Sequence, residues 1–472
     1  MKRMRGKGWM VQLMLFSTTV MTGQGLFESS LAGDERPETG SVLSLGGYIR
    51  SVIYAGNTPE EEQPYLQSAY GETSLMLDAA GGSVASARAE VRFRYGTEFG
   101  KTVKEMELRE AYVDLEAGPA TFSLGKKIIT WGKATLFQPT GKINPMDPTV
   151  RSPEEDDRYT GAWSVQGTLN LGSSMRITGT WKPLYQPSVL LIEPVPMPDY
   201  VNFLQPGYPS TELDQGSYAF NYDLYTSVLD ASLYWFDGYQ HWPGISLDTI
   251  KLDPATFQPT SLDLMEKAYR VRMLGADLSL PLGSWIFRLE GAWQDPAGSW
   301  KEKEHVPFPE LSYTAEIERS GTYLTLLAGY YGKYILEYEA PAAEPSLSAD
   351  PEQMIELIQS GVQITPQLIN EMTRQRLAAF NRLYNDQLDE FLHSVFLVFR
   401  GDVWHSRVEF TLPVVYRITT EEWILQPGIS FSPADGVRIT AGFTGLYGGE
   451  NSLYDLVGPV LNAGFLSTRI MF

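Results

Sequence analysis

The chain has 472 residues, 57 acidic and 37 basic side chains, a net charge of −20 and no cysteine. The lack of cysteine excludes a disulfide framework and thiolate metal sites, and the negative charge argues against nucleic-acid binding. After the N-terminus, no stretch approaches the ~20 apolar residues of a membrane helix, a test that membrane β-strands escape because their lipid-facing and lumen-facing residues alternate.

The first 32 residues are predicted to be a signal peptide. Four basic side chains within residues 2–7 precede an apolar stretch at 10–21, and small residues suited to cleavage occur at 23–25 and 30–32. The apolar stretch is too short to serve as an uncleaved membrane anchor. We therefore expect residues 33–472 to form the exported protein.

Segments in which apolar and polar residues alternate recur along the rest of the chain. Within residues 85–95, for example, Val91 and Phe93 alternate with Glu90, Arg92 and Arg94. Such a two-residue period predicts strands with one face suited to lipid and the other to water. We expect 18 strands, at 42–55, 71–79, 84–97, 105–116, 119–130, 160–171, 174–183, 216–224, 228–238, 266–280, 284–294, 309–318, 322–339, 393–402, 405–416, 421–432, 436–447 and 461–472, although 16 remains an alternative.

The connections between these segments alternate in length. Short turns are predicted at 80–83, 172–173, 281–283 and 433–436, and long loops at 131–159, 184–215, 239–265 and 340–392. Bacterial barrels combine an even strand count with short periplasmic turns and long external loops. The sequence therefore predicts an all-β fold, a transmembrane antiparallel up-and-down β-barrel of the bacterial outer membrane.

The loop at 131–159 follows the fifth predicted strand and is rich in glycine and proline, which indicates a fixed, non-repetitive path. In general porins the loop after the fifth strand folds inward and narrows the pore, so by analogy this loop is a candidate constriction. Its charged candidates for the constriction are Lys133, Asp147, Glu154, Glu155 and Asp156.

The loop at 340–392 is predicted to contain a helical insertion at 345–392. Asp350 and Thr365 each precede a proline, as capping residues do at the start of a helix. The second helix is expected to run to about His393, with Ile369, Met372, Phe380, Leu383 and Phe391 near one face. The helix is interpreted either as an external lid packed on neighbouring loops or as a gate over the pore.

The last predicted strand places Leu466, Thr468, Ile470 and Phe472 on one face, and the chain ends on an aromatic residue. This pattern resembles the signal that the barrel-assembly machinery reads, so Phe472 is the candidate assembly signal.

Basic side chains dominate the predicted inner wall of the barrel. The pore-lining candidates are Arg50, Arg88, Arg92, Arg94, Lys127, Arg176, Arg270, Arg272, Arg288, Arg400, Arg407 and Arg438. Rings of Arg and Lys favour anions in a pore. The alternative is that these arginines pair with inward acids such as Glu90 and brace a filled barrel.

Several motifs resemble those of a largely uncharacterised family of proteobacterial outer-membrane barrels, usually described as a domain of unknown function. They are Leu108–Leu115, Leu124–Lys127, Trp131–Lys133, Asn144–Asp147 and Trp235–Tyr239, and the resemblance spans mainly residues 105–295. It implies a porin-like barrel with a transport role and names no substrate.

The sequence contains no recognisable catalytic motif. The four histidines lie in no G-x-S-x-G or H-E-x-x-H pattern, and no cofactor or metal is expected. The leading hypothesis is a channel for passive diffusion of small polar solutes, leaning toward anions or acidic saccharides. The alternatives are a non-conducting scaffold that holds a partner or presents adhesive loops, and a barrel of the polysaccharide-export type.

Overall fold

The structure is a computed structural model that describes residues 41–58, 61–190, 198–253, 259–296, 300–301, 303–347, 363, 365–449 and 452–472. The predicted signal peptide and the predicted first helix after Asp350 lie outside the described residues.

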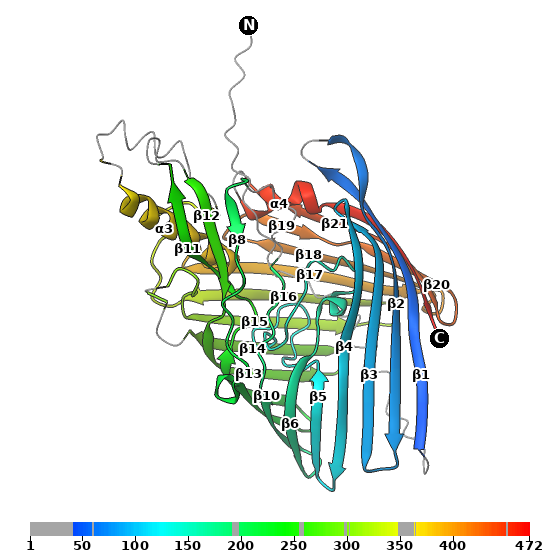
Figure 1. Cartoon of the computed structure of the whole chain (residues 1–472). Helices are drawn as coiled ribbons and strands as arrows, with labels where there is room; N and C mark the ends of the chain where they lie inside the picture. The colour runs from blue at the N-terminus through cyan, green and yellow to red at the C-terminus, as the bar shows by residue number, and fades with distance from the viewer. Residues whose placement is uncertain are drawn as a thin grey trace.

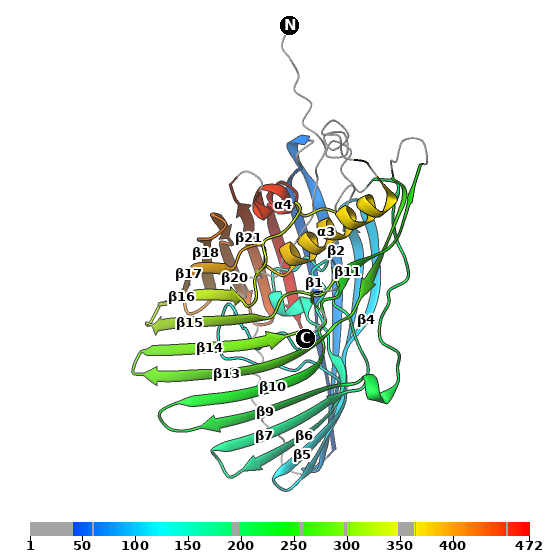
Figure 2. The same ribbon diagram turned by 90° about the vertical axis from the view of Figure 1, so that its left-hand side faces the viewer.

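One large antiparallel sheet closes on itself (Figures 1 and 2). Its strands are β1 (Ser41–Thr58), β2 (Glu61–Gly81), β3 (Ala85–Glu98), β4 (Lys101–Ala117), β5 (Ala120–Lys127), β6 (Ala162–Leu171), β7 (Met175–Lys182), β9 (Ser217–Tyr225), β10 (Asp230–Tyr239), β13 (Arg270–Leu282), β14 (Trp285–Asp295), β15 (Glu310–Ser320), β16 (Leu324–Ile335), β17 (Phe391–Val403), β18 (Val408–Arg417), β19 (Glu422–Leu425), β20 (Gly428–Ala434), β21 (Val437–Tyr447) and β22 (Ala463–Met471). Both β19 and β20 pair with β18 and with β21, so they are two parts of one barrel strand. Pairing of β1 with β22 closes the barrel, and the prediction of 18 strands is confirmed.

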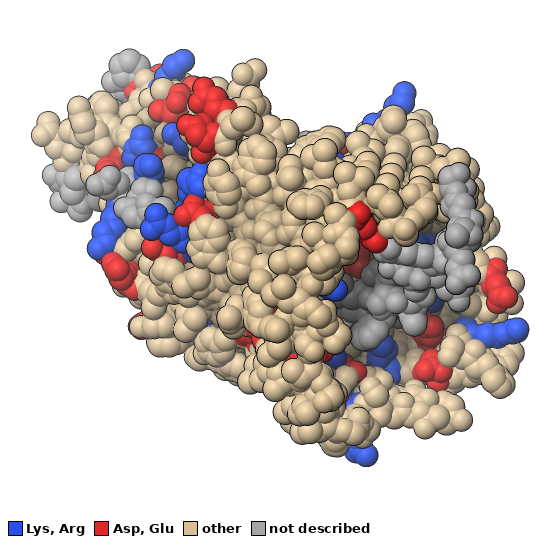
Figure 3. Space-filling model, turned by 90° about the horizontal axis from the view of Figure 1, so that it is seen from below, with Lys and Arg blue, Asp and Glu red and all other residues tan. Residues whose placement is uncertain are grey.

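Alternation along each strand sorts the side chains into two faces. On β3, Arg92 and Arg94 are buried inside the barrel, whereas the alternating residues Phe93 and Tyr95 are exposed on its outer surface. In the view from below, charged side chains gather toward the margins of the molecule and the middle of this face carries few of them (Figure 3). An apolar outer band around a closed sheet is what a membrane-spanning barrel requires, because the sheet has no unpaired edge in lipid.

Long connections gather at one end of the barrel, here called the loop end, and short turns at the other, the turn end. The loop end carries a second sheet that the sequence did not predict, made of β8 (Val201–Phe203), β11 (Gly244–Leu252) and β12 (Pro259–Lys267). It also carries the helices α3 (Pro366–Tyr384) and α4 (Leu453–Leu461) (Figure 1). In bacterial barrels the end with long loops faces the exterior.

The helix α3 begins as predicted, because the Thr365 side chain accepts a hydrogen bond from the Leu368 backbone N–H at 3.2 Å. Its predicted end near His393 is wrong. The helix stops at Tyr384, and Phe391 begins β17, where it is paired with Tyr334 of β16. Strand pairing in the barrel wall therefore outweighs the helical periodicity of these residues. None of the helices in the described part of the chain is long and apolar enough to cross a membrane.

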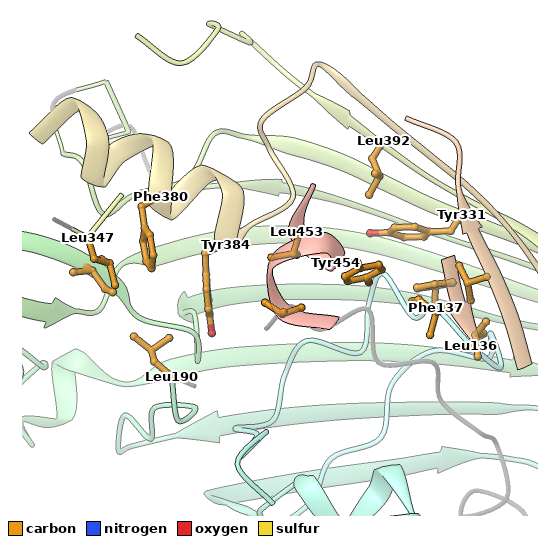
Figure 4. Packing of buried hydrophobic residues seen from close by; sticks show 14 of the residues in the cluster. Leu136, Phe137, Leu190, Tyr331, Leu347, Phe380, Tyr384, Leu392, Leu453 and Tyr454 are labelled. Atoms are coloured by element: carbon orange, nitrogen blue, oxygen red, sulfur yellow. The ribbon is translucent and has the colours of Figure 1, made fainter. Parts of the chain in front are cut away.

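A hydrophobic cluster fills the loop end. It joins Phe380 and Tyr384 of α3 and Tyr454 of α4 to inward residues of the wall such as Tyr331 (Figure 4). Phe380 and Tyr384 project from α3 in the same direction (Figure 4). Asn381 of α3 also exchanges hydrogen bonds with the Ile245 backbone of β11. These contacts hold α3 against β11 and the wall, and its role as a lid or as a gate stays a prediction.

Gly125 in β5 adopts a φ of +141°, and a Cβ there would lie 2.2 Å from the Ala111 carbonyl oxygen of β4. We expect Gly125→Ala to destabilise the barrel by about 1–3 kcal/mol, since both the backbone strain and the clash act on the wall. Heat-shift electrophoresis should show that this variant unfolds at a lower temperature than the wild-type protein. The matched control is Gly71→Ala in β2, where no atom lies within 4 Å of the added methyl group. Equal effects of the two variants would contradict the prediction.

Candidate functional site

The connection between β5 and β6, residues 128–161, lies inside the barrel and is here called the inner loop. Its residues Trp131 and Ile143 are buried with Tyr234 and Phe236 on the inward face of β10. The Trp131 and Tyr234 rings have centroids 4.9 Å apart. The inner loop therefore occupies the lumen, as the analogy with general porins predicts.

Two inward carboxylates of the facing wall hold the first part of the inner loop. Glu290 of β14 accepts hydrogen bonds from the backbone N–H groups of Lys133, Ala134 and Thr140 at 2.9–3.0 Å. Glu316 of β15 accepts from the backbone of Thr135 at 2.8 Å and of Leu136 at 3.1 Å.

A close approach of chain to wall makes this anchoring possible. Gly132 has a φ of +89°, and a Cβ there would lie 2.7 Å from the Glu290 carboxylate oxygens. Glycine at this position lets the backbone N–H groups reach the carboxylate. The loop path is therefore fixed by charge-assisted hydrogen bonds.

Two lysines add ion pairs to the same wall. Lys133 Nζ lies 3.0 Å from Asp277 Oδ1 of β13, and Lys142 Nζ lies 3.0 Å from Glu310 Oε1 of β15. Lys333 of β16 approaches the other oxygen of Glu310 at 3.1 Å. The inner loop is thus tied to at least three neighbouring strands.

The other end of the inner loop is acidic and meets arginines of the opposite wall. Asp157 Oδ2 lies 2.6 Å from Arg50 Nη1 of β1, and Asp157 Oδ1 lies 3.1 Å from Arg92 Nη2 of β3. Both oxygens of Glu154 lie 2.7 Å from Arg469 Nη1 of β22. Although burial acts to raise the pKa of Asp157, the two guanidinium groups hold it far below its usual range.

Arg109 reaches the same acidic segment from a β-bulge. The register of β3 against β4 shifts between Glu90 and Val91, and Arg109 is left without a partner residue in the ladder. Its Nη1 lies 3.2 Å from Glu90 Oε2, and its Nη2 donates to the backbone oxygen of Asp156. Because a bulge redirects a side chain, strict alternation did not identify Arg109 as an inward residue.

Most predicted pore-lining candidates lie on the inward face. These are Arg50, Arg88, Arg92, Arg94, Lys127, Arg176, Arg288, Arg400 and Arg438. Their part in a pore stays a prediction, and their pairing differs widely. Arg50 is fully buried between Glu72 and Asp157, whereas the Arg88 side chain is 39% exposed and its carboxylate partner Asp78 lies 3.8 Å away.

The predicted inward placement is wrong for three arginines. Arg270 and Arg272 of β13 share their face with Leu274, which is 54% exposed, whereas Val271 and Met273 point inward and are buried against the inner loop. Because apolar residues of the inner loop lie inside the barrel here, the inward face of β13 is apolar and its arginines lie on the outer face, the reverse of the expected pattern. Asp237 pairs with both arginines on the outer face. Arg407 lies in the turn between β17 and β18.

The predicted constriction residues have separate contacts within the inner loop. Asp147 accepts a hydrogen bond from the Thr149 backbone N–H at 2.9 Å, and Glu155 pairs with Arg158 at 2.9 Å. Lys133 and Glu154 hold the loop to the wall, as described above. Asp156 contributes its backbone oxygen to Arg109, and burial raises the pKa of its carboxyl group.

Asp157, Glu290 and Glu316 were not singled out as loop-holding residues from the sequence. A short 3₁₀ helix runs over Glu155–Arg158, with Glu154 directly before it and Asp157 within it. A spacing of three residues places both on one side of such a helix, which is the signal that could have identified the pair. The anchoring roles of Glu290 and Glu316 depend on loop backbone that is distant in sequence, and no local pattern shows them.

A cavity of about 130 Å³ lies on the loop-end side of the inner loop. Its walls are the inner loop, Gln240 and Trp242 of the loop after β10, Tyr331 and Lys333 of β16, and the residues that end α3. Phe137 and Tyr331 stack there with ring centroids 4.7 Å apart (Figure 4).

A buried junction joins three loops beside this region. Lys182 Nζ donates to the Ile143 carbonyl oxygen at 2.7 Å and lies 2.5 Å from His241 Nε2. His241 Nδ1 lies 2.5 Å from the Gln186 carbonyl oxygen. Burial, and then the charge of Lys182, lower the pKa of His241 to about 3. Within the described residues, no group of three or more His, Asp or Glu side chains could hold a metal ion.

No protein-family model and no curated protein matches the chain. Solved structures share its fold. Acinetobacter baumannii OccAB4 is 8% identical, with 93% of this chain and 100% of that chain covered and a TM-score of 0.51. Pseudomonas aeruginosa OccK2 (OpdF) in complex with glucuronate is 9% identical, with 91% and 97% covered and a TM-score of 0.50.

The outer membrane protein OpdK from Pseudomonas aeruginosa is 6% identical, with 91% of this chain and 98% of that chain covered and a TM-score of 0.51. At identities this low, these comparisons show a shared fold alone. The chain is therefore an outer-membrane β-barrel with a porin-like fold, and its resemblance to an uncharacterised family stays a prediction.

Glu290→Gln tests how the inner loop is held. A glutamine keeps one acceptor oxygen but cannot serve all the backbone donors, so we expect a loss on the order of 2 kcal/mol. This loss of unfolding free energy is measured by urea unfolding in lipid vesicles, with tryptophan fluorescence as the readout. The same substitution at Glu409, which is 28% exposed and 3.7 Å from Arg438, should cost less than about 1 kcal/mol. Equal losses would show that Glu290 does not anchor the loop.

Acid should loosen the His241 junction. Its folded pKa of about 3 lies below the unfolded value of 6.5, so only the unfolded junction gains a proton as the pH falls below 6.5. The contribution of His241 to stability is complete above pH 6.5 and decreases progressively toward pH 3. Hydrogen–deuterium exchange at residues 240–247, corrected for intrinsic rates, should therefore accelerate on acidification. His241→Gln should remove this dependence and His405→Gln, in an exposed turn, should not.

Proposed function

We propose that the protein is a channel for passive diffusion of small polar solutes across the outer membrane, without enzymatic activity. The barrel interior carries many charged side chains. Because buried ion pairs stabilise a protein no better than apolar packing does, their number inside this barrel supports a functional role. An inner loop anchored to two opposite walls narrows the lumen at a defined place. The porin-like fold and the resemblance of residues 105–295 to outer-membrane barrels support the same function.

We propose further that the channel favours small anions, including acidic saccharides. The observation that carries this proposal is the presence of inward cations with incomplete pairing toward the turn end. Arg88 is partly exposed, and Arg176 is exposed with Asn170 at 3.2 Å. In contrast, Arg50 and Arg92 are paired with the two carboxylates of Glu72 and Asp157, so they contribute little to selection. The glucuronate in the OccK2 structure is an acidic saccharide, which fits the proposal.

A second candidate is a non-conducting scaffold. The hydrophobic cluster at the loop end, where α3 and α4 pack against the wall, favours it. A scaffold is closed by side chains, whereas a channel needs a continuous water path. Conductance in a planar bilayer separates the two functions.

Arg88→Gln tests anion preference. In an asymmetric KCl gradient, the wild-type protein should give a reversal potential of anionic sign, and Arg88→Gln should shift it toward cations because a fixed positive charge leaves the lumen wall. Arg272→Gln is the matched control, since it removes the same charge from the outer face, where the Arg272 side chain is 62% exposed.

Equal reversal potentials for wild type and Arg88→Gln, or cation preference in the wild type, would overturn the anion proposal. Absence of conductance from folded protein, including a variant without residues 345–384, would favour the scaffold.

A further inference from the structure

Two arginines on the outer face of the barrel have no part in the lumen. Arg270 and Arg272 lie at the loop end of β13, on the same face as Leu274, which is 54% exposed. An arginine on the lipid-facing side of a barrel is costly at the middle of the bilayer and costs little near its interfaces. The depth of these two side chains therefore decides what they contact.

Tryptophans on neighbouring strands give that depth. Trp235 of β10 is paired with Leu274, and Leu274 is paired in turn with Trp293 of β14, on strands that lie side by side (Figure 2). Tryptophan is enriched at the boundary between lipid and water. Arg272 lies two residues, or about 7 Å along the strand, beyond Leu274 toward the loop end. It is therefore placed at the level of the lipid headgroups in the outer leaflet.

Asp237 of β10 holds both guanidinium groups in place. Its Oδ1 lies 2.8 Å from Arg270 Nη2, and its Oδ2 lies 3.3 Å from Arg272 Nε. Arg270 also lies over the Tyr239 ring at 5.0 Å and donates from Nη1 to the Gly216 carbonyl oxygen at 3.3 Å. A side chain that is already held in one position loses less conformational entropy when it binds a ligand.

The remaining guanidinium donors favour an anion with several oxygens. A guanidinium group has five N–H donors, and the contacts above use two from Arg270 and one from Arg272. The Arg270 and Arg272 side chains are 32% and 62% exposed, whereas the carboxylate between them is 27% exposed. The fork of N–H donors matches the oxygens of a phosphate group.

The charges of this patch identify the source of the phosphate. Asp295 of β14 is the ladder partner of Arg272, and with Asp237 it balances the two arginines. A patch without net charge does not concentrate a free anion from bulk water. A lipid headgroup is instead kept at this level by its acyl chains, which gives it a high effective concentration beside the donors.

We infer that Arg270 and Arg272 bind the phosphate group of a lipid headgroup in the outer leaflet. The inference goes beyond the proposed function, because the site lies on the lipid-facing side of the wall and requires no passage through the lumen.

Native mass spectrometry of the detergent-solubilised full chain tests the inference, with diphosphoryl lipid A and its dephosphorylated form as probes. We expect the phosphorylated probe to bind about tenfold more tightly than the other form, and the double variant Arg270→Gln/Arg272→Gln to lose this difference. Asp295→Asn should strengthen binding, because it removes a carboxylate that repels the phosphate. The matched control is Arg319→Gln, since Arg319 lies on the outer face at the turn end, beside Trp285, and should leave binding unchanged.

Heat-shift electrophoresis checks that each variant is folded. Equal binding of the two lipid probes, unchanged binding in the double variant, weaker binding in Asp295→Asn, or an equal loss in Arg319→Gln would each rule out this site. Displacement of the lipid by an equal concentration of inorganic phosphate would assign the arginines to a free anion and would also contradict the inference.

Discussion

Closure of the sheet is the constraint on which the rest of the structure depends. A closed sheet that faces lipid outward places most of its charged residues inside, where each needs a partner or water. On one wall, Arg50, Arg92 and Arg469 point into the lumen, and on the facing wall Glu290 and Glu316 do so. The inner loop satisfies both sets, with carboxylates toward the arginines and backbone N–H groups toward the glutamates. Loop position and wall charge are therefore two aspects of one electrostatic arrangement.

This arrangement divides the inward arginines into two groups. Those in contact with the acidic end of the inner loop are paired with carboxylates, as the pairing hypothesis made from the sequence predicts, and selectivity stays a proposal for the others. Arg88 and Arg176 lie beyond the loop, and their side chains are partly or fully exposed. An anion that passes the inner loop would meet these side chains, and not the buried ones, as the positive part of the wall.

The sequence was sufficient to predict the barrel but not to predict the contacts in its interior. A two-residue period requires only that one face be apolar, and β3 shows it from Ala85 to Tyr95. On β13 both faces carry apolar residues, because Val271 and Met273 pack on the inner loop while Leu274 faces outward. Periodicity alone cannot assign such a strand. Arg109 escaped notice because a bulge interrupts the alternation, and the roles of Glu290 and Glu316 depend on loop backbone more than 140 residues away in sequence.

The attachment of the inner loop to two walls has a mechanical consequence. A barrel without a cross-link can flatten into an oval when the surrounding lipid compresses it, since neighbouring strands pivot about their shared hydrogen bonds. Here the inner loop acts as a strut from Glu290 on β14 to Arg50 and Arg92 on β1 and β3. Any change in the barrel's cross-section must stretch one set of these contacts, so the shape of the wall and the width of the passage are coupled.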